Sequence, residues 1–486
     1  MTRTALAALV AVTATATPAS GDTFEAQKTP REPGIRALGT CAPSEKDAKK
    51  ARFTLAHVND LQARYSERLD GKSRYAYIAG YLRKLKKQNP ATLVVDAGDD
   101  YEKGSIAELH SHGETTRRMV QAMPFDVRTI GNHDFAYGEA ALLRDVRLSQ
   151  HPVLASNLTW LGHAPEESPF ASFVRINVGC VRVGVIGLVT QGFDAADRST
   201  GAPYFGTFAQ SVFYVDIANR IAEEHRAEVD VMIALTHIGL ADDTILAART
   251  TGIDLVVGAH SEDTLDHPGF VRHKDGSKAW IMQVGHFGEK VGRAEVVVDR
   301  EDKSLAVTDY EVVPVDASLP VADDVDALAK SLDGDETHAV IARLDAPIKQ
   351  GKEMSELLFR ALRGDALFVG RDLFWAGLPR GEVTLQRLYD ATLVQKEPSG
   401  TTGFSSLWTF DVTGAELARL KARFRPGWFY DAFLPSPIEP TKTYHVVLDK
   451  RAYAEAAVYF GGKVPKATFR GEMVDVLAKY LESGGR

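Results

Sequence analysis

The sequence predicts an α/β protein in which a mainly parallel sheet covered by helices is followed by a second, smaller domain. Short apolar runs alternate with amphipathic helical stretches from residue 52 onward, which is the order that a parallel sheet requires. Each apolar run ends in polar residues, as strands do where they reach the ligand-binding edge of an open sheet. The length of 486 residues exceeds what one hydrophobic core usually serves, so two domains are expected.

The amino-terminal segment, residues 1–20, has the features of an export signal. Arg3 precedes an apolar run over 5–12, and small residues follow as far as Ala19. This run is too short to span a bilayer and no later stretch reaches that length, which favours a periplasmic or secreted protein without a transmembrane segment. Residues 21–50 are rich in Lys, Pro, Gly and Thr and are expected to form a flexible tether. One bridge between Cys41 and Cys180 would suit an oxidising compartment, and the sequence leaves this pairing open.

The first domain is predicted to cover residues 51–315. Its first strands are expected at 53–58, 93–95 and 127–130, with a helix around residues 78–85 after the first of them. Further strands are expected at 183–188, 229–235, 253–257, 280–284 and 293–298. An Asp-rich helix is expected to link the domains over 316–345. The second domain, 346–486, is predicted to contain helices near 353–362, 385–392 and 472–481.

Five strand endings carry side chains that bind divalent metals. They are Asn59-Asp60-Leu61-Gln62, Gly98-Asp99-Asp100, Gly131-Asn132-His133-Asp134, Thr236-His237 and Gly258-Ala259-His260-Ser261-Glu262. The glycines allow the backbone to turn off the strand, so the next side chain projects into the crevice. Carboxylate, amide and imidazole groups are ligands of divalent metals, so five such endings in order indicate a metal centre.

This order of motifs resembles the calcineurin-like metallophosphoesterase superfamily and, within it, the two-domain 5'-nucleotidase and UDP-sugar hydrolase family. The resemblance implies a four-layer αββα sandwich followed by a smaller α/β domain like the carboxyl-terminal domain of 5'-nucleotidases. It also implies two divalent metals, from among Mn, Zn, Mg and Ca, that activate water against a phosphate ester. In the order of the motifs, the implied ligands of the first metal are Asp60, Gln62, Asp99 and Glu262, and those of the second are Asp99, Asn132, His237 and His260. Asp99 would bridge the pair, and His133 resembles the family's catalytic histidine, which stabilises the phosphoryl group or protonates the leaving oxygen.

Three residues depart from the family pattern. Gln62 stands where a histidine is usual, and Glu262 stands where relatives carry His or Gln. These two changes make the first site an all-oxygen set, which favours a harder metal such as Mn, Mg or Ca there. Ala136 replaces the aspartate that pairs with the catalytic histidine, so His133 is expected to be less firmly oriented. Asp134 is near in sequence but is expected to point elsewhere.

In the family, the second domain holds the nucleoside with arginines and stacked aromatic rings. Here Arg371 is the candidate for a charged contact, and Phe404, Trp428 and Phe429 are the candidates for base stacking. The glycine pair and the Pro-Phe-x-Asn loop typical of the family are replaced by other residues, which leaves the nucleotide preference open.

The sequence therefore predicts an exported phosphohydrolase that releases phosphate from a 5'-nucleotide or a related phosphomonoester, a step of nucleotide catabolism. Two alternatives on the same scaffold are a 2',3'-cyclic phosphodiesterase and a sulfur-ester hydrolase similar to the thiosulfohydrolases. A third is a degenerate relative that binds a phosphorylated ligand without turnover. The net charge of -8 gives no general attraction for a nucleic acid polymer, so the expected partner is a small phosphoester. The oligomeric state stays open.

Overall fold

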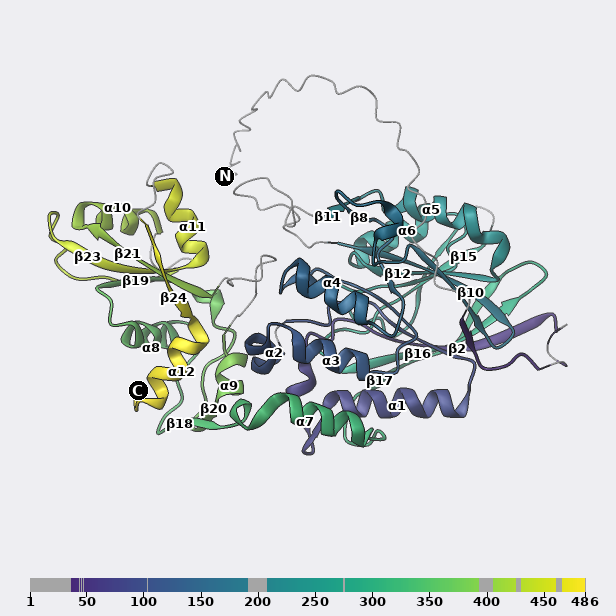
Figure 1. Ribbon diagram of the computed structural model, residues 1–486, viewed down its shortest axis with the longest axis horizontal. Helices are drawn as coiled ribbons and strands as arrows, with labels where there is room; N and C mark the ends of the chain where they lie inside the picture. Colours follow the sequence, from purple (N-terminus) through teal and green to yellow (C-terminus); the bar gives the residue numbers. More distant parts are fainter. Residues whose placement is uncertain are drawn as a thin grey trace, which may run out of the picture.

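The computed structural model describes residues 36–42, 44, 46, 48–102, 104–190, 208–273, 276–392, 405–424, 430–459 and 466–485. The predicted export signal lies outside these residues. Two large sheets form the first domain, and a third sheet forms the second domain (Figure 1).

The first domain is built on a six-stranded and a seven-stranded sheet. In the six-stranded sheet the order is β17 (Leu305–Pro314), β16 (Lys290–Asp299), β2 (Lys50–Val58), β5 (Thr92–Asp96), β6 (Val127–Thr129) and β7 (Val153–Leu154). In the seven-stranded sheet it is β1 (Arg36–Leu38), β9 (Phe173–Val178), β10 (Val181–Val189), β12 (Val231–His237), β13 (Leu255–Val257), β15 (Lys278–Met282) and β14 (Gly269–Arg272). β2, β5, β6 and β7 are parallel neighbours, and so are β10, β12, β13 and β15. Their carboxyl ends therefore gather at one edge of each sheet.

Alternating side chains within the strands divide the first domain into four layers. Phe53 and Leu55 of β2 face the core between the two sheets, whereas Ala56 and Val58 face the helices outside, because successive side chains of a strand point to opposite faces. The helices that cover the six-stranded sheet are α1 (Arg74–Gln88), α3 (Glu114–Ala122) and α7 (Asp323–Thr337), and those that cover the seven-stranded sheet are α5 (Tyr214–His225) and α6 (Leu240–Arg249). The αββα sandwich predicted for this domain is confirmed.

Smaller elements complete the first domain. They are the strand pairs β3 (Arg68–Leu69) with β4 (Lys72–Ser73) and β8 (Leu158–Trp160) with β11 (Phe208–Gln210), and the helices α2 (Ile106–Ser111) and α4 (Glu139–Leu148). Among the described residues, no helix combines the length and the apolar character needed to cross a membrane.

The second domain is a five-stranded sheet with helices on both faces. Its strand order is β22 (Tyr430–Phe433), β19 (Ala366–Gly370), β23 (Thr443–Asp449), β21 (Ser406–Thr413) and β24 (Thr468–Glu472). One face packs against α8 (Lys352–Leu362) and α12 (Met473–Glu482), and the other against α10 (Gly414–Phe424) and α11 (Lys450–Tyr459). A ribbon of β18 (Val340–Leu344) and β20 (Gly381–Thr384) leads into α9 (Leu385–Asp390).

The Asp-rich segment between the domains is packed rather than extended. Val325 and Ala329 of α7 are buried in the core that α1 and α3 share, and α7 runs alongside α1 (Figure 1). The acidic side chains face cations of the first domain, since Asp326 pairs with Lys72 and Arg68. The acidic composition therefore reflects contacts with the first domain.

Helix α2 and the second domain meet through a small interface. Ile106 and Leu109 belong to the same buried cluster as Leu388 of α9. Gln386 of α9 accepts a hydrogen bond from Ile106 N at 3.0 Å and donates one to Gly104 O at 3.1 Å. The second domain is thereby hydrogen-bonded to the loop that follows β5.

Part of the predicted tether over 21–50 is folded, which corrects the expectation for that part. Residues 36–38 form β1, which pairs in parallel with β9 at the edge of the seven-stranded sheet. The sequence did not indicate this strand, because an edge strand is held by backbone hydrogen bonds on one side and three residues are too few to show hydrophobic periodicity. Cys41 lies shortly after β1 and forms a disulfide with Cys180 at the turn between β9 and β10.

Candidate metal centre and active site

The five predicted strand endings meet where the two sheets present their carboxyl ends. Asp60 follows β2 and Asp99 follows β5 in one sheet, while His237 ends β12 and His260 follows β13 in the other. Asn132 and His133 follow β6, and a short 3-10 helix over His133–Phe135 begins there. The structure thus brings together all seven candidate ligands, Asp60, Gln62, Asp99, Asn132, His237, His260 and Glu262, in one cluster of contacts.

Backbone contacts between the loops set this cluster. Asp60 N donates to Gly98 O and Gln62 N donates to Asp99 O, each at 2.9 Å. Left-handed backbone occurs at five of the candidate ligands, with φ of 51° at Asp60, 45° at Gln62, 59° at Asp99, 77° at His260 and 58° at Glu262. Because non-glycine residues rarely adopt these angles, such a concentration marks a site whose geometry is held by its surroundings.

Asp99 and His237 form the floor of the site. His237 Nε2 lies 3.0 Å from Asp99 Oδ2, and its Nδ1 lies 2.8 Å from Ala97 O, which orients the ring. Burial alone would lower the pKa of His237, but the ion pair with Asp99 raises that pKa to about 10. Burial likewise opposes ionisation of Asp99, yet the neighbouring histidines hold its pKa below the ordinary value. In the protein alone, a proton on His237 therefore balances the charge of Asp99.

Asp60 presents one carboxylate oxygen without a hydrogen bond. Its Oδ2 accepts from Asn59 Nδ2 at 2.8 Å and from His260 N at 3.2 Å. Its Oδ1 is buried and has no hydrogen-bond partner among the described residues, and it lies 4.0 Å from His237 Nε2. Burial is the main reason that the pKa of Asp60 rises to about 7. A cation at this oxygen would offset the cost of burying the charge.

Gln62 and Glu262, two of the departures from the family pattern, contact each other. Gln62 Nε2 donates to Glu262 Oε1 at 3.0 Å, and Gln62 Oε1 is buried without a hydrogen-bond partner in the described part of the chain. Glu262 Oε2 lies 3.3 Å from His286 Nδ1, a residue that the sequence did not single out as part of the site. The acidic change at 262 therefore orients the amide at 62 so that its carbonyl oxygen is the atom left to bind a ligand.

Asn132 and His260 lie on the more open side of the site. Asn132 Oδ1 is 2.8 Å from His260 Nδ1. Both residues are partly exposed, as is Glu262, whereas Asp60, Gln62, Asp99 and His237 are buried. A substrate would therefore reach the cluster from the side of these partly exposed residues.

The donor set fits divalent cations. One ligand atom from each of Asp99, His237 and His260 lies within 4.8 Å of the other two. The partnerless oxygens of Asp60 and Gln62 are buried polar atoms that need a partner, and a cation supplies one. Carboxylate, amide and imidazole donors of this kind suit first-row divalent metals and Mg or Ca.

A glutamate contacts the candidate catalytic histidine, contrary to the expectation that this histidine lacks a carboxylate partner. His133 Nδ1 lies 2.5 Å from Glu102 Oε2, and both side chains are buried. Asp134 does point elsewhere, as expected, because its Oδ2 accepts from Asp99 N at 2.8 Å and Gly131 N at 2.6 Å. Ala136 is buried and offers no polar group. Sequence reasoning missed Glu102 because this residue lies in an irregular loop 31 residues before the histidine, where no pattern marks it.

Of the substrate-binding candidates in the second domain, the structure describes Arg371. Arg371 follows β19 and donates from Nε to Asp431 Oδ1 at 2.7 Å, a contact within the second domain. Phe404, Trp428 and Phe429 lie outside the described residues.

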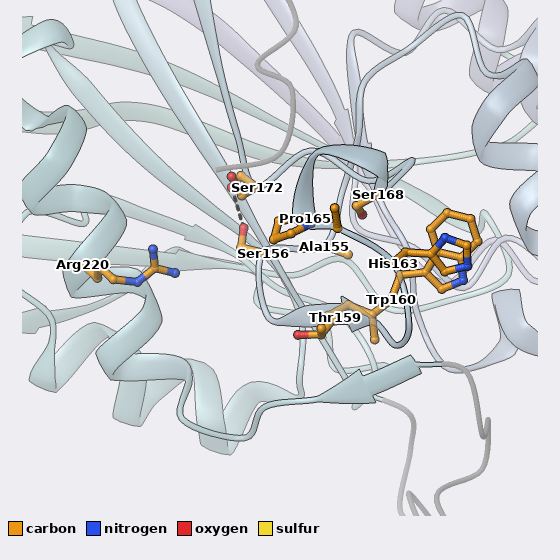
Figure 2. Close-up of a pocket in the computed structure, with 11 residues that line it drawn as sticks. Ala155, Ser156, Thr159, Trp160, His163, Pro165, Ser168, Ser172 and Arg220 are labelled. Carbon is orange, nitrogen blue, oxygen red and sulfur yellow. Dashed lines mark hydrogen bonds between the residues drawn. The ribbon is translucent and has the colours of Figure 1, made fainter. Parts of the chain in front are cut away.

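A separate pocket lies between the loop after β7 and helix α5 (Figure 2). The Trp160 and His163 rings stack there with centroids 3.4 Å apart, and Ser156 Oγ donates to Ser172 O at 2.5 Å. Its lining residues include none of the candidate ligands, so this pocket does not extend the metal cluster.

Comparison with known proteins identifies the first domain. Residues 53–261 match the calcineurin-like phosphoesterase family. The first domain belongs to this family. A snake venom 5'-nucleotidase from Crotalus adamanteus is 27% identical over 290 residues, which cover 54% of this chain and 48% of the venom protein. The chain thus spans about half the length of the curated relatives that it matches.

The fold is shared over most of the chain, including the part beyond the phosphoesterase domain. The structure of a 5'-nucleotidase precursor from Thermus thermophilus matches with a TM-score of 0.67 and 19% identity, covering 89% of this chain and 96% of that protein. The sulfate thiohydrolase SoxB of Thermus thermophilus matches with a TM-score of 0.61 and 18% identity, covering 89% and 94%. At such identities the likeness concerns the two-domain fold alone.

Proposed function

We propose that this chain is an exported, metal-dependent phosphohydrolase that releases phosphate from a 5'-nucleotide or a related phosphomonoester. The observation that carries the proposal is the convergence of seven metal-binding side chains from both sheets on one cluster, with His133 beside it. A binding module has no need of such a cluster, whereas phosphoester hydrolysis does.

Two cations would share this cluster. Asp60, Gln62 and Glu262 would hold one of them, Asn132, His237 and His260 would hold the other, and Asp99 would contact both. When bound, the cations would supply positive charge to the phosphoryl oxygens and make water a better nucleophile near neutral pH. Asp99 suits the shared position because His133 N holds its Oδ1 at 2.7 Å, which leaves Oδ2 to face the site.

His133 would act on the phosphoryl group or its leaving oxygen. Its Nε2 lies 3.9 Å from Asp99 Oδ2 and so is directed toward the cluster, while its Nδ1 contacts Glu102 on the other side. A histidine that carries a proton on both ring nitrogens can keep its contact with Glu102 through Nδ1. It can then donate a hydrogen bond or a proton from Nε2 to an oxygen that gains negative charge as the ester breaks.

The first metal position should favour a harder ion. All four of its candidate ligands offer oxygen, whereas the second position includes two imidazoles. Oxygen donors suit Mn, Mg or Ca better than Zn. Elemental analysis of protein purified without chelator would give a hard metal at one position, and stoichiometric zinc in both positions would contradict this assignment.

The nucleotide preference and the location rest on similarity and on the amino-terminal sequence. Relatives named 5'-nucleotidases match 54% and 57% of this chain, and the segment 1–20 has the features of an export signal. We propose residues 51–315 as the catalytic domain and 346–486 as the substrate domain, joined by 316–345. Arg371, Phe404, Trp428 and Phe429 would then contact the nucleoside.

A substrate screen on the full mature chain tests the proposal. AMP, UDP-glucose, 2',3'-cyclic AMP and bis-nitrophenyl phosphate are compared with added Mn, and Asp99→Asn serves as the inactive control. We expect phosphate release from AMP that Asp99→Asn abolishes. Absence of hydrolysis on every phosphoester with Mn, Mg, Ca or Zn would overturn the proposed activity, and preference for the cyclic substrate would replace the phosphomonoesterase assignment with a phosphodiesterase.

A further inference from the structure

The buried contact between Glu102 and His133 lies on the side of the histidine that faces away from the metal cluster. Glu102 Oε2 is 2.5 Å from His133 Nδ1, and the two side chains are 2% and 8% exposed. Burying a carboxylate with so little access to water costs free energy unless the carboxylate is paired. The contact with His133 therefore strongly favours this arrangement of the two side chains.

A hydrogen bond to a buried residue of α2 holds the backbone of Glu102. Glu102 lies three residues after Asp99 on the same loop and has a left-handed backbone with φ of 68°. Its N–H donates to Glu108 Oε1 at 2.8 Å, and Thr116 donates its hydroxyl to the other oxygen of Glu108. Glu108 and Thr116 are themselves buried. The loop is therefore fixed by α2 and α3, which places the carboxylate reproducibly.

This contact decides how the imidazole is turned. A proton on Nδ1 directed to Glu102 leaves Nε2 on the side of Asp99 Oδ2, which is 3.9 Å away. The nearby aspartate does not compete, since Asp134 accepts from two backbone N–H groups. Ala136, where the family pattern has an aspartate, has no group that could make this contact.

We propose that Glu102 is the positioning residue for His133 and replaces, from a different loop, the carboxylate that is absent at position 136. The inference rests on the proposed phosphohydrolase function, in which His133 acts on the substrate. Glu102 does not touch substrate; it fixes the orientation and the tautomer of the imidazole that does.

A double-mutant cycle tests this inference. Glu102→Gln should lower kcat on AMP by roughly tenfold or more with KM within about threefold of wild type, because general acid–base groups contribute on the order of 10²-fold to 10⁴-fold. In a His133→Ala background the same change should have no further effect, since there is no imidazole left to orient. Adding Ala136→Asp to Glu102→Gln should restore part of kcat, because it returns a carboxylate to the family position. Asp333→Asn is the matched control, because Asp333 is a buried carboxylate that pairs with Arg68 on the helical side of the domain.

A second measurement does not depend on turnover. In metal-free protein labelled with ¹⁵N-histidine, the His133 signals are those that disappear in His133→Ala, and they should show the proton on Nδ1 in the wild type and a changed tautomer balance in Glu102→Gln. Wild-type kcat in Glu102→Gln, an equal loss in both backgrounds, or unchanged His133 nitrogen shifts would overturn the inference. An inactive wild type would instead overturn the proposed function, and the nitrogen shifts would then decide the role of Glu102.

Discussion

Gly131, which begins the loop carrying Asn132 and His133, should not tolerate even one methyl group. A Cβ added there would lie 2.1 Å from Asp99 Oδ1 and 2.5 Å from His237 Nε2. Because a Cβ essentially never approaches another heavy atom more closely than 3.0 Å, the Asp99 carboxylate would have to retreat by about 0.9 Å, or the loop by a similar amount. A displacement near 1 Å at a reacting site costs about 10²-fold in rate, which corresponds to about 2.7 kcal/mol of barrier.

The assay for Gly131→Ala combines hydrolysis of an aryl phosphate with bound-metal analysis and thermal unfolding. We expect kcat/KM to fall by about 100-fold and the metal content to fall with it. Gly269→Ala is the control, since its Cβ would meet Ile281 no closer than 3.8 Å and the position lies on an edge strand. A folded Gly131→Ala protein that keeps its metals and more than a third of wild-type activity would refute the assigned geometry.

Three further predictions concern the metals, a buried histidine and the disulfide. Dialysis against a chelator should abolish hydrolysis, and Mn should restore it; activity that survives complete metal removal would contradict the metal-centre assignment. Burial lowers the pKa of His57 to about 3, so the neutral form stabilises the fold above pH 6.5 and this contribution is lost as the pH falls from 6.5 towards 3. Between pH 7.5 and 5 the wild type should therefore lose about 2 kcal/mol more unfolding free energy than His57→Gln, and parallel curves from urea titrations would speak against this. Cys41→Ser should lower the unfolding free energy by about 5 kcal/mol in the chain-entropy model, because the bridge to Cys180 spans 139 residues, and an unchanged melting temperature would show that the bridge is absent or without effect.

The sequence was sufficient for the parts of the site that follow regular strands. Asp60, Asp99 and His260 come directly after apolar runs in which glycine or a short polar motif marks the turn, and these residues meet in the structure. The helix at 353–362 was predicted almost to the residue because its apolar side chains repeat at helical spacing and α8 buries them.

The parts that the sequence did not reveal depend on pairings across long separations. From the sequence, Gln62 and Glu262 could be treated only as two separate oxygen donors, since 200 residues separate them. Their direct hydrogen bond follows from the fold. Glu102 lies in a loop without periodicity, so its contact with His133 leaves no trace in the local pattern. Strand β1 could not be predicted for a similar reason. It pairs with β9 through backbone hydrogen bonds, which require no particular side-chain pattern over three residues.

The two hydrogen bonds made by Gln386 bear on how the protein should be dissected. They end on Gly104 and Ile106, just beyond the stretch that carries Asp99 and Glu102. Truncation before the second domain would remove both bonds and uncover Ile106 and Leu109, so the stretch would lose its anchor at one end. The phosphoesterase half expressed by itself would therefore not represent the intact chain. Weak turnover by such a fragment would reflect the loss of these contacts.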